Sequence, residues 1–285
     1  MVNHQNIKLQ PGLYLVGTPI GTARDITLRA LDILASADLL VAEDTRSMRK
    51  LLDIHGVPLA DRPLFSHHDH SGQRVTERVL QAVGDGQSVA YASEAGMPMI
   101  ADPGFELARA ISDAGYSVTS APGPSAAITA LALAGLPTDA FFFAGFLPSS
   151  ATARKARLEA LREVPGTLIF YESPRRVKAM LEDARATLGG RRDGAICREL
   201  TKKFEEIKRG TLQDLAETAP EKLRGEVVVL IGRADPAERE AVDIDAALRD
   251  ALTSMSVKDA AEMVSKAHGL PKRSVYQRAL TFVER

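Results

Sequence analysis

The amino-acid sequence predicts an α/β protein with two α/β domains and a small helical domain at its carboxyl end. Short apolar segments alternate with amphipathic helical segments over residues 12–121 and again up to residue 232. This alternation is typical of sheets flanked by helices. After residue 234 the sequence becomes charged, and its apolar residues recur at helical spacing. We therefore expect three domains, at residues 1–122, 123–236 and 237–285.

The first domain is expected to start with a strand at residues 13–16 (LYLV), a helix through residues 28–34 and a second strand at residues 39–41. Residues 88–92 (SVAYA) are short and apolar and follow a Gly-Asp-Gly turn, as a buried parallel strand should. The next segment, residues 93–104 (SEAGMPMIADPG), combines small residues with prolines. Loops at the carboxyl ends of parallel strands form ligand crevices, so we predict a ligand-binding loop here.

The second domain and the tail have their own signals. Ser125 is placed to cap an Ala- and Leu-rich helix that follows a Pro/Gly turn. In the tail, residues 264–276 indicate two helices joined by a tight turn that contains Gly269, which fits a helix-turn-helix. Four apolar segments predict the strands of the second domain: residues 141–143, 167–170, 194–197 and 227–231.

The composition is that of a globular protein, with 45% hydrophobic and 26% charged residues. No segment approaches the roughly 18 uninterrupted apolar residues of a membrane span. The amino terminus lacks a secretory pattern, and Cys197 is the only cysteine. We expect a cytoplasmic protein without membrane contact. The net charge of -1 gives no sign of nucleic-acid binding, which must then depend on local basic clusters.

The loop after the first strand, residues 17–21 (GTPIG), places two glycines around a proline. A dinucleotide-binding fingerprint needs Gly-x-Gly-x-x-Gly at this position, so the spacing argues against NAD. Six motifs follow one another along the chain: residues 17–21 with 25–27 (DIT), 42–46 (AEDTR), 93–104, 122–126 (PGPSA), 170–174 (FYESP) and 198–206 (RELTKKFEE).

Together these motifs resemble the tetrapyrrole methylase superfamily and, within it, the methyltransferases of small-subunit ribosomal RNA. The resemblance covers about residues 12–232, and the helical tail is similar to that group's helix-turn-helix appendage. It implies two α/β domains of the tetrapyrrole methylase type with the cofactor crevice between them, and a homodimer. It also implies 2′-O-methylation of a cytidine ribose in the decoding region of 16S rRNA, within the small ribosomal subunit, with S-adenosylmethionine as methyl donor.

The resemblance also implies which residues bind the cofactor. The chain departs from the family's usual pattern at Glu94, Met97 and Met99, changes that leave backbone contacts of this loop possible. An adenosyl ligand suits an apolar slot with a few backbone hydrogen bonds, and a sulfonium donor needs no metal. The expected cofactor-binding residues are Pro19, Gly96, Met99, Ile100, Ala101, Ser125, Ala126, Tyr171, Leu200, Gly225 and Val227.

A base that removes the hydroxyl proton would accelerate methyl transfer. Several ionisable residues stand at or just after the carboxyl ends of predicted strands, and the sequence does not choose among them. Each also has an ordinary interpretation as a helix cap or an ion-pair partner. The candidates are Glu43, Asp44, Glu172, Glu199 and Lys202.

His67, His68 and His70 are residue types that bind zinc. Adjacent residues of an extended segment point to opposite sides, so we expect substrate contact or a structural loop there and no metal site. Basic residues gather at residues 154–157, 175–178, 202–209 and 272–273, as phosphate binding requires. The expected RNA-binding residues are Arg46, Arg175, Arg176, Lys202, Lys203, Lys272 and Arg273.

Two other functions remain open at this point. A methyltransferase that modifies a carbon of a tetrapyrrole precursor would share the fold and the donor. Such enzymes typically carry Gly-Asp-Pro where this chain has residues 96–98 (GMP), and they lack the AEDTR and YESP motifs. A non-catalytic RNA-binding assembly factor would keep the fold without using the donor, and Met97 and Met99 keep that alternative open. Donor binding distinguishes it from an enzyme.

Overall fold

The computed structural model describes residues 3–67, 72–234 and 236–283. The chain divides into two compact units. The first contains the residues up to Leu161 together with Gly166–Gly232, and the second contains Arg162–Pro165 and the residues from Arg233 onward. Within the described ranges, every helix is too short or too polar to cross a bilayer.

The first sheet of unit one is wholly parallel, with the strand order β3-β2-β4-β1-β5. Successive residues of its strands face opposite sides. Leu13 and Leu15 pack with helices α3 and α4, whereas Tyr14 and Val16 pack with α1 and α2. Burial on both faces explains why the three inner strands, β1, β2 and β4, are mostly apolar. The strands are β1 (Gly12–Val16), β2 (Leu39–Ala42), β3 (Leu64–Ser66), β4 (Ser88–Ala92) and β5 (Val118–Ala121).

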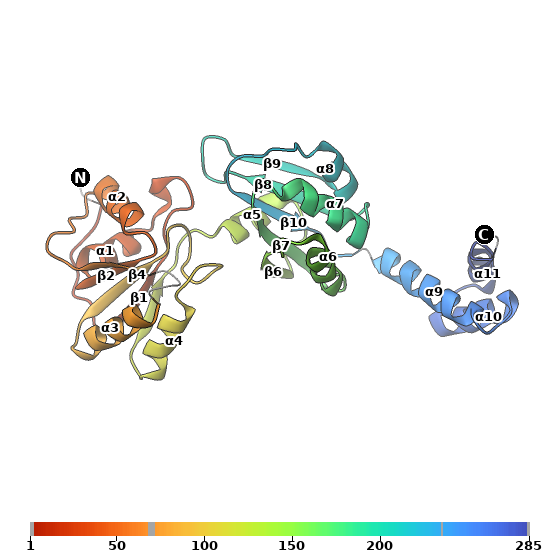
Figure 1. Ribbon diagram of the computed structural model, residues 1–285, viewed down its shortest axis with the longest axis horizontal. Coiled ribbons are helices and arrows are strands. Elements are labelled where there is room, and N and C mark those ends of the chain that lie inside the picture. The colour runs from red at the N-terminus through yellow and green to blue at the C-terminus, as the bar shows by residue number, and fades with distance from the viewer. Residues whose placement is uncertain (1–2, 68–71, 235, 284–285) are drawn as a thin grey trace. The chain divides into compact units, whose positions relative to one another are not determined.

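Figure 1 shows α1 and α2 on one side of this sheet and α3 and α4 on the other. The predicted helix through residues 28–34 is confirmed as α1. It begins where the Thr27 side chain accepts a hydrogen bond from the amide of Ala30. The helices are α1 (Leu28–Ser36), α2 (Thr45–His55), α3 (Gly72–Gly84), α4 (Phe105–Asp113) and the short 3₁₀-helix η1 (Ala23–Asp25).

The second sheet of unit one is mixed, with the order β6-β7-β10-β8-β9. Strand β6 is parallel to β7, while β10 is antiparallel to both β7 and β8. The four predicted strands are present. The fifth, β9, has the polar sequence EIKRGT and pairs with β8 at the sheet edge. The strands are β6 (Phe141–Phe146), β7 (Thr167–Glu172), β8 (Asp193–Arg198), β9 (Glu206–Thr211) and β10 (Val227–Ile231).

Helix α5 packs its alanines and Leu131 against Ile169 and Leu230 of the second sheet. Ser125 occupies the N-cap position of α5, but its side chain makes no capping hydrogen bond, so that part of the expectation was wrong. Helix α6 packs against α7, and α7 against α8. The helices are α5 (Ala126–Ala134), α6 (Ala151–Ala160), α7 (Val177–Leu188) and α8 (Leu212–Thr218).

The second unit contains three helices in its described part: α9 (Pro236–Leu252), α10 (Val257–His268) and α11 (Lys272–Leu280). Its core includes Leu248, Val264 and Val275. The predicted helical pair is confirmed as α10 and α11. Gly269, with φ of 64°, ends α10 in the left-handed conformation that glycine adopts without strain.

Candidate functional site

The first unit contains a cavity of about 410 Å³ that is lined by residues following strands of both sheets. Strand β10 contributes its amino end. Because β10 is antiparallel to β7 and β8, Val227 at its start pairs with Glu172 and Arg198 at their carboxyl ends. The cavity is therefore placed where parallel α/β sheets bind ligands.

Nine of the eleven expected cofactor-binding residues line this cavity. Pro19 is outside the lining, whereas its neighbour Ile20 is in it. Met99 packs instead against the core between the first sheet and helices α3 and α4, and Met97 takes its place in the cavity. The nine that line the cavity are Gly96, Ile100, Ala101, Ser125, Ala126, Tyr171, Leu200, Gly225 and Val227.

The loop of residues 93–104 is fixed by its backbone. Thr18 and Gly96 exchange amide-to-carbonyl hydrogen bonds of 2.9 and 3.1 Å, which tie the loop to the segment after β1. Met99 and Ala101 have φ angles of 70° and 66°, a region that residues with a side chain rarely adopt. Such strain persists only where the surroundings hold the chain in place, and it concentrates at functional sites.

Tyr91 and His67 are buried side chains that support this loop through hydrogen bonds. The Tyr91 hydroxyl, on a fully buried side chain, donates a hydrogen bond of 2.7 Å to the carbonyl of Pro103. Nδ1 of His67 lies 3.2 Å from the same hydroxyl, and the two rings meet edge to face. His67 is thus part of the loop's support. His68 and His70 lie outside the described residues, within which no three potential metal ligands come together.

Glu172 is the one candidate base in the cavity lining. Its side chain is fully buried. Oε1 accepts a hydrogen bond of 2.7 Å from the amide of Ser173 and lies 3.2 Å from Nε of Arg176, while Oε2 has no hydrogen-bond partner among the residues that the structure describes. Burial raises the pKa of Glu172, and the Ser173 amide and the Arg176 charge oppose that rise.

Glu43 and Asp44 follow β2 but are outside the cavity lining. Oε2 of Glu43 accepts a hydrogen bond of 3.2 Å from the amide of Glu94. Asp44 caps helix α2 and pairs with Arg46, whose Nη2 lies 3.0 Å from Oδ2. The hydrogen bonds from Arg46 hold the pKa of Asp44 below its usual range. Both carboxylates are therefore engaged in local structure.

Glu199 and Lys202 lie outside the cavity lining and support two residues of it, Gly225 and Glu226. Oε1 of Glu199 accepts a hydrogen bond of 3.0 Å from the amide of Glu226, which lowers the pKa of Glu199. Its carboxylate fills the space beside Gly225, where a β-carbon would lie 2.4 Å from Cδ of Glu199. Nζ of Lys202 lies 3.1 Å from carboxylate oxygens of both Glu199 and Glu226. These contacts hold the start of β10 against the segment after β8.

Asp102 is a cavity residue that sequence reasoning missed, although it lies inside the predicted ligand loop. It is half-buried. Burial, reinforced by the charge of Glu43, raises the pKa of Asp102 to about 6, against the opposing hydrogen bond from Ser93. The signal that could have found it is its position between Ala101 and Pro103 in a loop already assigned to the ligand.

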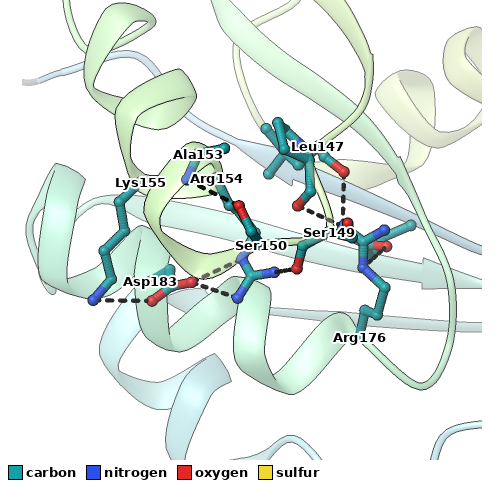
Figure 2. Close-up of polar contacts among 10 residues, drawn as sticks. Leu147, Ser149, Ser150, Ala153, Arg154, Lys155, Arg176 and Asp183 are labelled. Carbon is teal, nitrogen blue, oxygen red and sulfur yellow. Dashed lines mark hydrogen bonds and ion pairs between the residues drawn. The ribbon is translucent and has the colours of Figure 1, made fainter.

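Several residues expected to bind RNA are occupied by the protein itself. Figure 2 shows Arg176 turned toward the segment after β6, where Nη2 donates hydrogen bonds to the carbonyls of Leu147 (2.7 Å) and Pro148 (2.9 Å). Lys272 pairs with Glu262. Lys202 and Arg46 make the ion pairs described above. The side chains of Arg175, Lys203 and Arg273 are exposed.

Arg154, from the basic cluster at residues 154–157, is also internal. Its side chain is only 7% exposed, and Nε donates a hydrogen bond of 2.7 Å to Oδ2 of Asp183 on α7. Its Nη1 reaches the carbonyl of Ser149 at 3.1 Å, and the exposed Lys155 lies 3.3 Å from the other carboxylate oxygen (Figure 2). Arg154 and Arg176 together fix the backbone that follows the cavity residue Phe146.

Comparisons with known proteins place the chain among methylases. Residues 12–216 match the family Tetrapyrrole (Corrin/Porphyrin) Methylases, and residues 238–282 match the RsmI C-terminal HTH domain. A uroporphyrin-III C-methyl transferase from Thermus thermophilus, solved in complex with S-adenyl homocysteine, has the same fold. Its TM-score is 0.55 at 18% identity, and the match covers 78% of this chain and 97% of that one.

Two curated relatives match over nearly their whole length. Ribosomal RNA small subunit methyltransferase I of Mesorhizobium japonicum is 46% identical over 95% of this chain and 92% of its own. The protein of the same name from Escherichia coli O157:H7 is 41% identical over 98% of this chain and 99% of its own. The chain therefore belongs to the tetrapyrrole methylase family and, within it, to the ribosomal RNA small subunit methyltransferase I family.

Proposed function

We propose that this protein transfers a methyl group from S-adenosylmethionine to the ribose 2′-oxygen of a cytidine in the decoding region of 16S rRNA. The observation that carries the proposal is the near full-length similarity to ribosomal RNA small subunit methyltransferase I, which includes the helical tail. The cavity supplies a place for the donor in the part of the chain that matches the methylase family.

The cavity suits S-adenosylmethionine in size and in chemistry. Ile20, Leu200 and Val227 give it apolar walls, and Gly96 and Ala101 bring backbone close to it. Such a slot, largely apolar with a few polar groups, is typical of small-molecule sites. When bound, S-adenosylmethionine supplies a methyl group activated by its positively charged sulfur.

The protein contributes to methyl transfer in two ways: it orients the donor and the ribose, and it provides a group that accepts the proton of the ribose hydroxyl. Holding the ribose hydroxyl in line with the methyl group accounts for much of the acceleration in reactions of this type. Of the five candidates, we propose Glu172 as the group that accepts the hydroxyl proton. It lines the cavity, and its Oε2 is unpartnered among the described residues, whereas the other four are engaged outside the lining.

RNA contacts are proposed for the exposed basic residues Arg175 and Lys203 of the first unit and Arg273 of the second. Their charges would neutralise phosphates, which dominate affinity for nucleic acids. A ribosomal substrate implies the cytoplasm as the site of action.

We also propose that the protein is a homodimer and that its domain boundaries lie near residues 122 and 236. The rRNA is proposed to be bound within the small ribosomal subunit.

A calorimetric titration of the full chain with S-adenosylmethionine tests the proposal at its first step. An enzyme of this kind binds the donor stoichiometrically. A well-folded protein that binds no donor, with or without RNA, would contradict the proposal and favour a non-catalytic RNA-binding factor.

A further inference from the structure

The charged side chains in the lining of the first unit's cavity are all acidic among the described residues. Asp102, Glu172 and Glu226 line it, and among the described residues its lining includes no lysine, arginine or histidine. A cleft lined by charges of one sign concentrates ligands of the opposite sign. The cavity is therefore suited to a cationic ligand and unsuited to a phosphate.

Asp102 differs from the other two carboxylates because it has no ion-pair partner among the described residues. The side chain of Glu172 is fully buried, with Oε1 held by Ser173 and Arg176. Glu226 is 75% exposed and pairs with Lys202 at 3.1 Å. Asp102 is half-buried and makes no ion pair with any described residue. It is the cavity carboxylate whose charge is not already neutralised.

Aromatic rings share the cavity with Asp102. Tyr171 and Phe146 both line it, and their rings meet edge to face with centroids 5.8 Å apart. Burial raises the pKa of Tyr171, and the charge of Asp102 adds to that rise, as expected for two groups facing the same space. Aromatic faces beside a carboxylate are a combination that binds organic cations.

The backbone places Asp102 firmly. It stands between Ala101, which has a left-handed φ, and Pro103, whose carbonyl is held by the Tyr91 hydroxyl. A side chain on a loop fixed in this way needs little reorganisation to meet a ligand, and preorganisation improves both affinity and discrimination.

We propose that Asp102 is the residue by which the cavity recognises the positive charge of the methyl donor and distinguishes it from the neutral product. This inference rests on the proposed function. S-adenosylmethionine carries a positively charged, methylated sulfur, whereas S-adenosylhomocysteine has lost the methyl group and has a neutral thioether; the rest of the two molecules is the same. A carboxylate that recognises the sulfonium strengthens binding of the first compound and not of the second.

The inference carries a definite pH dependence. In the free protein the pKa of Asp102 is about 6, so this carboxyl is largely neutral at pH 5 and ionised at pH 7. A bound cation lowers that pKa, so S-adenosylmethionine binds more tightly as the pH rises through 6 and releases protons as it binds. The charges of Glu43 and Glu94 face Asp102 and help to keep its pKa raised. Tyr171 also faces it, and the other ionisable groups in the cavity lining are Glu172 and Glu226.

Calorimetric titration of the full chain with S-adenosylmethionine and, separately, S-adenosylhomocysteine tests the inference. We expect Asp102→Asn, which keeps the shape and removes the charge, to weaken donor binding about tenfold, the equivalent of one pKa unit. Product binding should not change in parallel. The matched control is Glu106→Gln, an exposed carboxylate on the first turn of α4 outside the cavity lining, which should alter neither affinity.

Equal losses for the two ligands would overturn the inference, because Asp102 would then contact a group that both share. Unchanged donor affinity in Asp102→Asn would overturn it as well. The wild-type protein gives an independent test that needs no variant: donor affinity should rise between pH 5 and pH 7 while product affinity stays level. A wild-type protein that binds neither compound would instead contradict the proposed function itself.

Discussion

Gly104 shows how a single buried ring determines the backbone of the ligand loop. Its φ is +123°, and a β-carbon there would lie 2.9 Å from ring atoms of Tyr91. We expect Gly104→Ala to destabilise the protein by about 1–3 kcal/mol, because a strained backbone and a steric clash add together. Urea unfolding measures the loss.

Gly86→Ala is the matched control for this prediction. Gly86 also has a positive φ, +85°, but a β-carbon there would meet open space. Its substitution therefore carries the conformational strain without the clash, and the loss should be smaller. Equal losses in the two variants would show that the Tyr91 ring does not restrict position 104.

Glu172 is the residue on which the proposed proton transfer depends. We expect Glu172→Gln to lower kcat by about 100-fold to 10,000-fold, the usual contribution of a general base. Donor affinity measured by calorimetry should be retained, because the amide has the same shape as the carboxyl group. A variant with unchanged kcat would exclude Glu172 as the proton acceptor.

The local sequence predicted the loop that contains Gly96 as a ligand loop, and Gly96 lines the cavity. Ser125 lines the cavity too, but only the family resemblance placed it in the site. The choice between Met97 and Met99 depended on left-handed backbone at residue 99, which the sequence pattern does not reveal. The role of Glu199 depends on its contact with Gly225, a partner distant in sequence that only the folded chain brings near.

Helices α6 and α7 are joined by an ion pair between the buried side chains of Arg154 and Asp183. The exposed Lys155 pairs with the same carboxylate, so the buried and the exposed contact can be compared. Asp183→Ala leaves Arg154 charged and buried without its partner, which costs about 3–5 kcal/mol in comparable cases. Lys155→Ala removes an exposed partner of the same carboxylate and should cost less than about 1 kcal/mol. Chemical denaturation measures the free energy of unfolding of both variants. Equal losses in the two would show that burial of the Arg154–Asp183 pair has no special effect on stability.

The sequence pattern predicted most of the strands, including the largely exposed β6 with its three phenylalanines, and missed strands that are both half-exposed and poor in apolar residues. The apolar run of β10 is buried on both faces and was evident in the sequence. Strand β9 is a half-exposed edge strand in which Ile207 is the only apolar side chain, so it offered no apolar pattern to detect. Hydrophobic periodicity does not indicate the direction of a strand, so the sequence did not predict that β10 is antiparallel to β7. This direction places Val227, at the start of β10, in the cavity lining.

The whole molecule combines a donor-binding unit with a helical unit that matches the RsmI C-terminal HTH domain. If the second unit contacts RNA through Arg273, Arg273→Ala should weaken rRNA binding and reduce the salt dependence of the affinity by about one unit of slope. Donor affinity should be unaffected. Filter binding over a range of salt concentrations measures both effects.

The control for that prediction is Arg109→Ala, which removes an exposed arginine of α4 outside the proposed RNA-binding residues. It should leave the RNA affinity and its salt slope unchanged. Identical behaviour of the two variants would mean that the charge at position 273 has no specific part in RNA binding.

Methyl transfer to small ribosomal subunits distinguishes the proposed activity from methylation of a tetrapyrrole precursor. Small ribosomal subunits from cells that lack this protein would be incubated with it and with S-adenosylmethionine labelled in the methyl group, and the labelled RNA mapped by nuclease digestion. We predict label on the ribose of a cytidine in the decoding region. Subunits that remain unlabelled, while a tetrapyrrole precursor supplied in parallel accepts the label, would contradict the claim.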